Sequence, residues 1–386
     1  MTAGLLLPTA DGIVRHELRA GPLPSPSAVP PRSRVAYAAA HVVADPAGDN
    51  APDAPAVLDW DATLAFRHHL WSHGLGVADA MDTAQRGMGL DWAATAELVR
   101  RSAAEAAACG GALVSGAGTD HVAPRLGSLD EVVAAYEEQL EVVEGSGSGV
   151  VLMASRQLAA LAAGPDDYRA VYGRLLAQVR RPVVLHWLGA VFDPQLAGYW
   201  GHADPADAVD TVAGLIAEHA GAIDGIKVSV LDAAIEVRLR NALPSGVRLY
   251  TGDDFHYPEL IRGDDRGHSD ALLGILAAIG PVAAAALRRL DDGDVDGYDA
   301  LMEPTVALSR HLFSAPTPHY KTGIAFLAWL NGHQPGFTMV GGMQSARSLP
   351  HLAQTLRLAD AAGALADPDL AARRWHQLLQ VAGVTA

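Results

Sequence analysis

The sequence contains two short apolar runs, Pro182-Val183-Val184-Leu185-His186-Trp187-Leu188 and Ile223-Asp224-Gly225-Ile226-Lys227-Val228-Ser229-Val230. Both are rich in β-branched residues, which favours strands. The segment between them, Pro205 to Ala220, has the spacing of an amphipathic helix. Two strands joined by a helical crossover run parallel in one sheet. This unit therefore predicts an α/β fold with a parallel sheet.

The same alternation of apolar runs and helical segments continues from Ser33 onward. Eight such units in succession favour a closed (β/α)8 TIM barrel over a doubly wound sheet, which usually has fewer strands. We therefore expect a barrel over residues 33–293. The expected strands are Val35–Val43, Gly76–Met81, Ala112–Ser115, Gly149–Met153, Pro182–Leu188, Gly225–Val230, Val247–Thr251 and Ala271–Ile279. The expected helices include Ala62–Ser72, Trp92–Ala107, Leu129–Val142, Asp166–Val179 and Pro205–Ala220, several of which are opened by an Asp or Ser able to cap the first turn.

Both ends of the chain carry segments outside the expected barrel. Gly4 to Leu18 predicts a hairpin around Thr9-Ala10-Asp11-Gly12, because Asp-Gly between apolar runs favours a tight turn. The Pro-rich connector from Pro22 to Pro31 favours an extended path, so residues 1–32 are expected to form an N-terminal hairpin and arm. After Pro281 the pattern is helical through Gln380, which predicts a C-terminal helical region over residues 294–386.

Composition indicates a globular protein and excludes several function classes. Hydrophobic residues make up 50% of the 386 residues and charged residues 19%, which is incompatible with general disorder. The formal charge of -16 would repel nucleic acid and an anionic membrane surface. The longest apolar stretch, Ala271–Leu287, is broken by Gly280-Pro281, so we expect no membrane span. A lone cysteine, Cys109, and the absence of a basic export signal at Met1–Pro8 favour the cytoplasm.

Lys227 is the most informative candidate catalytic residue, because it interrupts an apolar strand. Burial disfavours an ammonium ion, and a neutral amine is the nucleophile that condenses with a carbonyl group. Of the 28 basic residues only Lys227 and Lys321 are lysine, and arginine cannot form a Schiff base. The alternative is a lysine that extends to the barrel rim and pairs with a carboxylate such as Asp253.

Several segments, in order, resemble the dihydrodipicolinate synthase and N-acetylneuraminate lyase family. Gly225-Ile226-Lys227 and Leu249-Tyr250-Thr251-Gly252-Asp253-Asp254 resemble two consecutive strands of that family, and the resemblance implies that Lys227 forms the Schiff base. The further matching segments are Leu113–Thr119 for the third strand and its glycine-rich end, Pro182–Trp187 for the fifth strand, Asp82-Thr83-Ala84-Gln85-Arg86 for the carboxylate-binding turn and Pro316–Lys321 for the Pro-x-Pro entry to a late helix. The resemblance covers roughly residues 33–335 and indicates a divergent branch.

The departures from the family pattern bear on the substrate. His186 stands where the family has the tyrosine that relays protons, and a histidine can still transfer a proton near neutral pH. A core histidine bonded to a backbone carbonyl is the alternative for His186. In the carboxylate-binding turn only Thr83 matches, and Asp82 replaces the leading glycine. The family arginine that binds a distal carboxylate is also missing, so dihydrodipicolinate synthesis itself is not expected. We expect a sugar-derived keto compound or a 2-oxo acid that bears hydroxyl groups.

Other polar groups at the ends of expected strands are candidate substrate-binding residues. Ser155 and Arg156 follow the fourth strand, where Arg156 could bind a carboxylate or lie on the surface. Asp253 and Asp254 follow the seventh strand, where one could hold a hydroxyl or Lys227, or cap a helix. Gly116, at the glycine-rich end of the third strand, completes the set together with Thr83 and Asp82.

No metal or cofactor is expected. His68, His69 and His73 lie on a helix expected outside the barrel and lack a nearby Glu. Gly116-Ala117-Gly118 is an incomplete dinucleotide-binding pattern, so a nicotinamide cofactor is not supported.

We therefore expect a class I lyase, aldolase or dehydratase that acts on a small keto substrate through Lys227, with His186 moving protons. Two alternatives stay open at this point: a metal-dependent sugar isomerase or epimerase with ligands His41, Asp82, His186 and Asp253, and a non-catalytic ligand-binding barrel. The family resemblance also implies a homo-oligomer, a dimer or tetramer.

Overall fold

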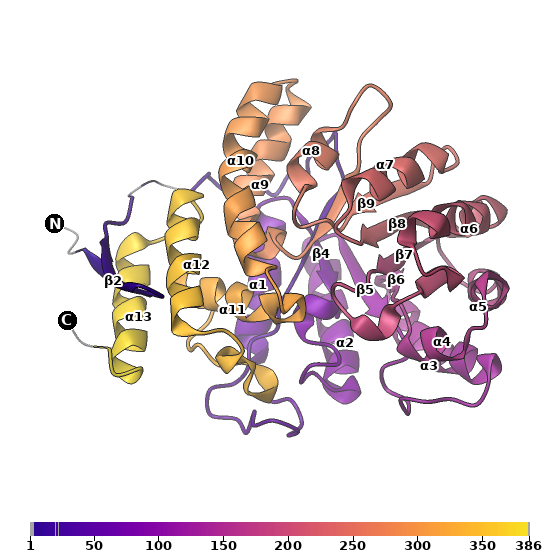
Figure 1. Cartoon of the computed structure of the whole chain (residues 1–386), viewed down its shortest axis with the longest axis horizontal. Coiled ribbons are helices and arrows are strands. Elements are labelled where there is room, and N and C mark those ends of the chain that lie inside the picture. Colours follow the sequence, from indigo (N-terminus) through magenta and orange to yellow (C-terminus); the bar gives the residue numbers. More distant parts are fainter. Residues whose placement is uncertain (1–3, 20, 22, 385–386) are drawn as a thin grey trace.

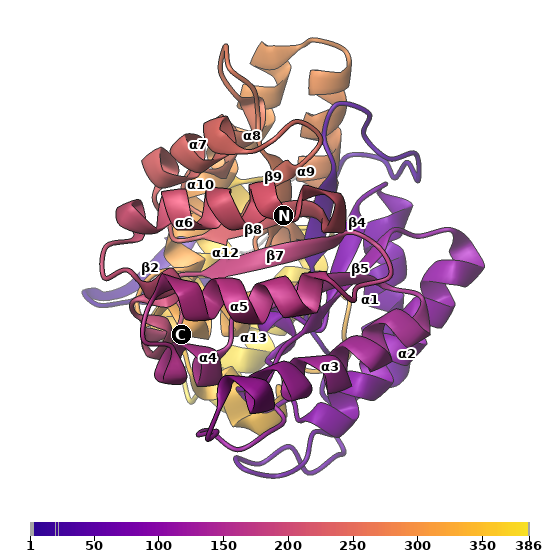
Figure 2. The same cartoon turned by 90° about the vertical axis from the view of Figure 1, so that its right-hand side faces the viewer.

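The computed structural model describes residues 4–19, 21 and 23–384. Within this part of the chain, eight parallel strands close into a barrel, and β10 pairs with β3 to complete it. Helices surround the strands (Figures 1 and 2), so the predicted (β/α)8 barrel is confirmed. The barrel strands are β3 (Ala36–Ala39), β4 (Gly76–Asp79), β5 (Leu113–Ala117), β6 (Gly149–Leu152), β7 (Val183–Leu188), β8 (Ile223–Ser229), β9 (Arg248–Thr251) and β10 (Asp270–Leu273).

The helices begin where the sequence provides caps. Asp59, Asp91 and Ser128 each accept a hydrogen bond from the first turn of the helix that follows. The helices outside the strands are α1 (Trp60–Ser72), α2 (Trp92–Cys109), α3 (Leu129–Ser146), α4 (Arg156–Leu161), α5 (Pro165–Leu176), α6 (Pro205–Glu218), α7 (Ala233–Ala242), α8 (Tyr257–Arg262) and α9 (Leu276–Asp291). None of the described helices combines the length and hydrophobicity that crossing a membrane requires.

Two expected strands end four or more residues before their predicted ends. The run Ala271–Ile279 contains β10 only to Leu273, and α9 begins at Leu276. The first turns of α9 are buried, and an apolar run that is buried on every side has no periodicity to separate strand from helix. The backbone of α9 departs from helical geometry at Ile279, just before Gly280-Pro281. The expected strand Val35–Val43 is likewise limited to Ala36–Ala39.

The predicted hairpin is confirmed and lies away from the barrel. Its strands β1 (Leu5–Thr9) and β2 (Gly12–His16) are antiparallel. The hairpin packs on α12 (Leu349–Ala361), and Trp375 of α13 (Pro368–Val381) donates a hydrogen bond to the Leu6 carbonyl at 2.8 Å. Figure 1 shows the hairpin beside α12 and α13, at the opposite end of the molecule from α5 and α6. Residues 1–3 and 385–386 of the predicted terminal segments, and residues 20 and 22 of the arm, including Pro22, lie outside the described residues.

The C-terminal helices pack directly against the barrel. They are α10 (Val295–Leu312), α11 (Tyr320–Leu330), α12 and α13. Every residue of α11 is buried, because the helix lies between α9 and the outer helices α12 and α13. This position brings the first residue of α11, Tyr320, to the carboxyl end of the barrel.

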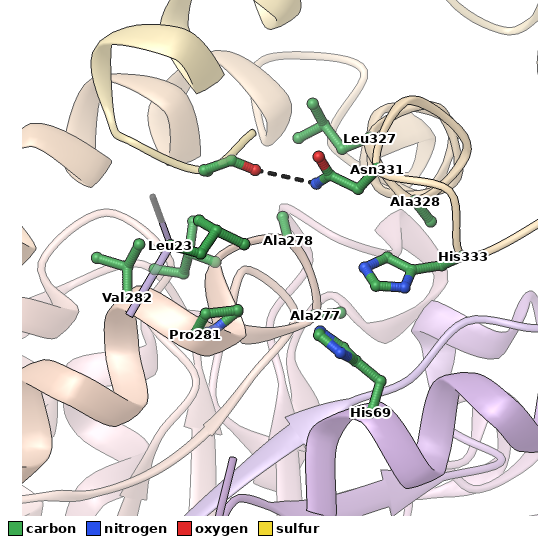
Figure 3. Close-up of a pocket in the computed structure, with 12 residues that line it drawn as sticks. Leu23, His69, Ala277, Ala278, Pro281, Val282, Leu327, Ala328, Asn331 and His333 are labelled. Carbon is green, nitrogen blue, oxygen red and sulfur yellow. Dashed lines mark hydrogen bonds between the residues drawn. The ribbon is translucent and has the colours of Figure 1, made fainter. Parts of the chain in front are cut away.

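A histidine cluster fills the junction between the barrel and these helices. The ring centroids of His69 on α1 and His333 after α11 are 4.2 Å apart. Figure 3 shows these two rings on one side of a small pocket, with Leu23 of the Pro-rich arm on the other. Burial, together with the charges of neighbouring histidines such as His73, lowers the pKa of His69 to about 3 and the pKa of His333 to about 4. Burial also lowers the pKa of His41 to about 4.

Acid should therefore destabilise the protein through this cluster. The three pKa values lie below the ordinary value of 6.5, so between pH 6.5 and pH 4 the unfolded chain binds more protons than the folded chain. We expect the free energy of unfolding, measured with urea, to fall steadily as the pH drops through this range. His333→Asn should reduce the slope, whereas the exposed His376→Gln should leave it unchanged. A slope identical in all three proteins would contradict this explanation.

A buried ion pair holds the carboxyl ends of β3 and β4. Arg67 of α1 donates to both oxygens of Asp79, at 3.1 Å and 2.7 Å, and also to the His41 carbonyl at 2.7 Å. Neither side chain of the pair is exposed. Because Asp79 ends β4, the pair fixes the point from which the next loop starts.

Removal of either Arg67 or Asp79 should strongly destabilise the protein, because it leaves an uncompensated buried charge. We expect Asp79→Ala to lower the free energy of unfolding by about 3–5 kcal/mol. The double variant Arg67→Met with Asp79→Leu should recover most of this loss. Arg174→Ala, which breaks an exposed pair with Asp130, is the matched control and should cost less than about 1 kcal/mol. Equal losses in Asp79→Ala and Arg174→Ala would show that the buried pair has no special role.

Candidate active site

Lys227 projects into the carboxyl end of the barrel from the middle of β8. Its neighbours across the sheet are His186 on β7 and Tyr250 on β9. The side chain is 7% exposed and lines a cavity of about 10 Å³, the space of one water molecule. No described residue forms a hydrogen bond or an ion pair with Nζ, and Nζ is not among the fully buried unpartnered atoms. The amine is therefore open to the cavity.

The surroundings of Lys227 make its ammonium group easier to deprotonate than in water. Burial lowers the pKa of Lys227, and Asp82 and Asp254 oppose this effect by raising it. Burial is the larger influence, so the pKa lies below its ordinary value. A lowered pKa makes the neutral amine, which a nucleophilic lysine requires, easier to form.

Gly252, in the loop after β9, makes room for the lysine stem. A Cβ atom at this position would lie 2.9 Å from Lys227 Cε and 2.7 Å from the Val228 carbonyl oxygen, and would collide with Ser229 Oγ. The glycine in the Thr251-Gly252-Asp253-Asp254 segment is thus explained by close approach of two strands around the lysine.

The turn after β4 supplies two more residues of the cavity, Asp82 and Thr83. Thr83 Oγ1 lies 2.8 Å from the hydroxyl of Tyr320, which comes from the C-terminal helix α11. Tyr320 lines the same cavity and stacks on Phe313 with ring centroids 4.3 Å apart. Burial raises the pKa of Tyr320 well above its ordinary value, so the phenol stays neutral. Sequence reasoning missed Tyr320, although it lies within the Pro316–Lys321 motif.

His186 does not line this cavity. It is fully buried, its Nε2 lies 3.3 Å from Ser229 Oγ, and its Nδ1 has no partner among the described residues. Burial and the charge of Lys227 place the pKa of His186 well below the ordinary value. This position fits a core histidine, although its partner is the Ser229 hydroxyl rather than a backbone carbonyl.

Asp254 and Asp253 have different surroundings although they are adjacent. Asp254 lines the cavity, and its Oδ1 accepts a hydrogen bond from the Ile275 backbone at 3.0 Å. Asp253 points elsewhere: its Oδ1 caps the backbone of Phe255 and His256, and its Oδ2 lies 2.8 Å from His256 Nδ1. Of the two, only Asp254 can reach a substrate bound at Lys227.

A larger cavity of about 260 Å³ adjoins the first one, since Asp82 and Leu188 line both. Arg156 lines it and pairs with Asp193 at 2.5 Å. Arg86 lines it as well and is fully engaged, with bonds to Asp120, to Gln139 and to the Gly116 carbonyl. The wall therefore contains both carboxylates, which accept hydrogen bonds from hydroxyl groups, and guanidinium groups, which donate to them.

Two predicted substrate-binding residues support this wall without lining it. Ser155 caps α4, and its Oγ lies 2.6 Å from Oγ1 of Thr119, a residue that does line the cavity. Gly116 allows close packing, because a Cβ atom there would lie 2.5 Å from the Ala80 carbonyl oxygen. The remaining lysine, Lys321, lines neither cavity. Its Nζ donates to the Pro318 carbonyl at 3.2 Å, and burial lowers its pKa to about 8.

The four ligands considered for a sugar isomerase do not converge. His41 Nε2 lies within hydrogen-bond distance of Gln334 Oε1, at 3.0 Å. His186 and Asp253 have different hydrogen-bond partners, Ser229 and His256. His68, His69 and His73 also form no ligand set, since His68 bonds Glu105 and His69 packs on His333. Over residues 4–19, 21 and 23–384, no group of three or more His, Cys, Asp or Glu side chains is placed to hold a metal ion.

The chain is similar to one sequence family and to a set of solved structures. The family described as "Protein of unknown function (DUF993)" matches residues 5–384. No curated protein matches the chain.

The similar solved structures include dihydrodipicolinate synthases. The 4-hydroxy-tetrahydrodipicolinate synthase of Methylacidiphilum fumariolicum is 16% identical with a TM-score of 0.67, covering 92% of this chain and all (100%) of its own. A prophage protein of the dihydrodipicolinic acid synthase family from E. coli K12, solved in complex with pyruvate, is 15% identical with a TM-score of 0.64, covering 91% and 99%. The Thermotoga maritima dihydrodipicolinate synthase is 12% identical with a TM-score of 0.62, covering 86% and 100%. These likenesses show the fold, in agreement with the resemblance seen in the sequence.

The close approach at Gly252 leads to a prediction about stability. Gly252→Ala should force β8 and β9 apart and lower the free energy of unfolding by about 1–3 kcal/mol, measured with urea. Gly221→Ala is the matched control, because a Cβ atom there would meet no atom within 4 Å. Wild-type stability of Gly252→Ala would show that the loop can move away from the lysine without cost.

Proposed function

The chain belongs to the family described as protein of unknown function (DUF993), and we propose that it acts as a Schiff-base-forming lyase through Lys227. One observation carries the proposal: an unpaired, buried amine opens into a cavity at the carboxyl end of a (β/α)8 barrel. Active sites of such barrels lie at this end. An amine in this state adds to a carbonyl group, and the resulting cationic nitrogen accepts electrons when a neighbouring bond breaks.

Each of the two adjoining cavities would hold one part of the substrate. The small cavity, with room for one water molecule, would hold the oxygen of the reacting carbonyl group next to Lys227, Thr83 and Tyr320. The larger one accommodates the remainder between Asp82, Arg156 and Asp193. We infer a 2-oxo acid or a sugar-derived keto compound that bears hydroxyl groups, because carboxylates accept from hydroxyls and guanidinium groups donate to them. The reaction class is cleavage, condensation or dehydration, which share the same adduct.

Thr83 and Tyr320 would hold the carbonyl oxygen in position. The hydroxyl groups are already hydrogen-bonded to each other at 2.8 Å, and Phe313 fixes the plane of the tyrosine ring. A side chain held in this way contributes to catalysis by orienting the substrate rather than by changing its own charge.

Reductive trapping tests the proposal directly. With sodium cyanoborohydride and a panel of 2-oxo acids and keto sugars that includes pyruvate, we expect a stable adduct on the peptide that contains Lys227. Peptide mass mapping is decisive because the chain has only two lysines. Lys227→Arg should abolish the adduct, and Lys321→Arg, at the second buried lysine, should retain it. Absence of an adduct on Lys227 with every compound of the panel would refute the proposed function.

A further inference from the structure

The cavity at Lys227 holds three other groups that ionise: Asp82, Asp254 and Tyr320. Schiff-base formation is accelerated by a group that can give and take a proton at the reacting centre. We propose that Asp254 is this acid–base catalytic residue. The assignment rests on the proposed function and adds a residue to its mechanism.

The position of Asp254 is fixed from two sides. Its Oδ1 accepts a hydrogen bond from the Ile275 backbone at 3.0 Å, at the start of α9. Its own carbonyl accepts one from Ser309 of α10 at 2.5 Å. The other carboxyl oxygen, Oδ2, has no hydrogen-bond partner among the described residues. One oxygen therefore anchors the carboxyl group while the other is available to a ligand beside Lys227.

The charges around Asp254 allow both protonation states. Its side chain forms no ion pair with any described residue, and Lys227 is the cation that influences it. Burial raises the pKa of Asp254 to about 7, with a smaller upward contribution from Asp253 that opposes Lys227. A carboxyl group titrating near neutral pH can act as an acid in one step and as a base in the next.

The other two candidates fit different roles. The phenol of Tyr320 stays protonated, as described above, so it donates a hydrogen bond without losing its proton. Asp82 lies at the boundary of the two cavities and acts electrostatically on both Lys227 and Lys321. We assign Asp82 to binding the part of the substrate that crosses this boundary.

The proposed steps balance without any further reactant. Lys227 Nζ adds to the carbonyl carbon, and a proton moves from the nitrogen to the oxygen, which gives a carbinolamine. Protonated Asp254 then gives its proton to that hydroxyl group, the C–O bond breaks, and water leaves. The products are an iminium ion and the Asp254 carboxylate beside it. The carboxylate can next remove a proton from the carbon adjacent to the iminium, which gives an enamine.

The test compares the rate at which pyruvate is trapped on Lys227 by cyanoborohydride in the full-length protein and its variants. Asp254→Asn keeps an oxygen for the Ile275 N–H, so the fold should be retained, and a thermal melt checks this. We expect Asp254→Asn to slow trapping about 100-fold or more. The wild-type rate should also change with pH around neutrality, and the variant should lose this dependence. Asp254→Glu should recover part of the rate.

Asp82→Asn is the matched control, because it removes the other carboxylate of the cavity. Asp82→Asn should slow the trapping of pyruvate less than Asp254→Asn does, because Asp82 acts on the cationic intermediate only through its charge, and the pH dependence of the rate should remain. Slow trapping by Asp82→Asn together with a wild-type trapping rate in Asp254→Asn would overturn the assignment and indicate Asp82 as the acid–base residue. If the wild-type protein forms an adduct that Asp254→Asn leaves unaffected at every pH, this inference fails while the proposed function stands. If the wild-type protein forms no adduct with any compound, the proposed function fails and this assignment fails with it.

Discussion

The ion pair between Arg67 and Asp79 holds together the part of the barrel on which the site is built. Through the His41 carbonyl, Arg67 joins the end of β3 to the end of β4, and the Asp82–Thr83 turn begins three residues later. Such a pair costs desolvation energy, and its hydrogen bonds offset that cost only while the geometry is kept. The turn is therefore constrained at its start. Its other end is fixed by Gln85, whose side chain donates to the Val340 carbonyl at 3.0 Å.

The C-terminal helices contribute residues to the candidate site in addition to packing against the barrel. Tyr320 and Phe313 close the cavity over Lys227, and Gly274 after β10 permits this, since a Cβ atom there would lie 2.9 Å from Phe313. The barrel alone would leave this end of Lys227 open to water, which favours the charged amine. Burial by α10 and α11 thus contributes to the lowered pKa of the lysine.

The sequence predicted what depends on local pattern and missed what depends on distant contacts. Eight strands and Lys227 could be located because apolar runs alternate with helical periods and because a lysine inside such a run is unusual. The position of Tyr320 in the cavity could not be predicted, because its hydrogen-bond partner Thr83 is 237 positions away in the sequence. Asp253 and Asp254 are equivalent in sequence, and only the packing of α9 and α10 separates them. His186 was placed by the family pattern, which does not show on which side of Lys227 the cavity lies.

Two carboxyl groups, those of Asp82 and Asp254, act on the amine of Lys227, and burial opposes them. Both act on the amine, yet neither lies within ion-pair distance of it, so burial outweighs them and the pKa of Lys227 falls. An iminium formed at Lys227 would be positively charged as long as its nitrogen keeps the proton. In the proposed reaction, the same carboxyl groups would act on this cation in a medium that screens it weakly, and would stabilise the protonated intermediate more than the free enzyme. A tighter ion pair would have stabilised the resting lysine and removed this difference.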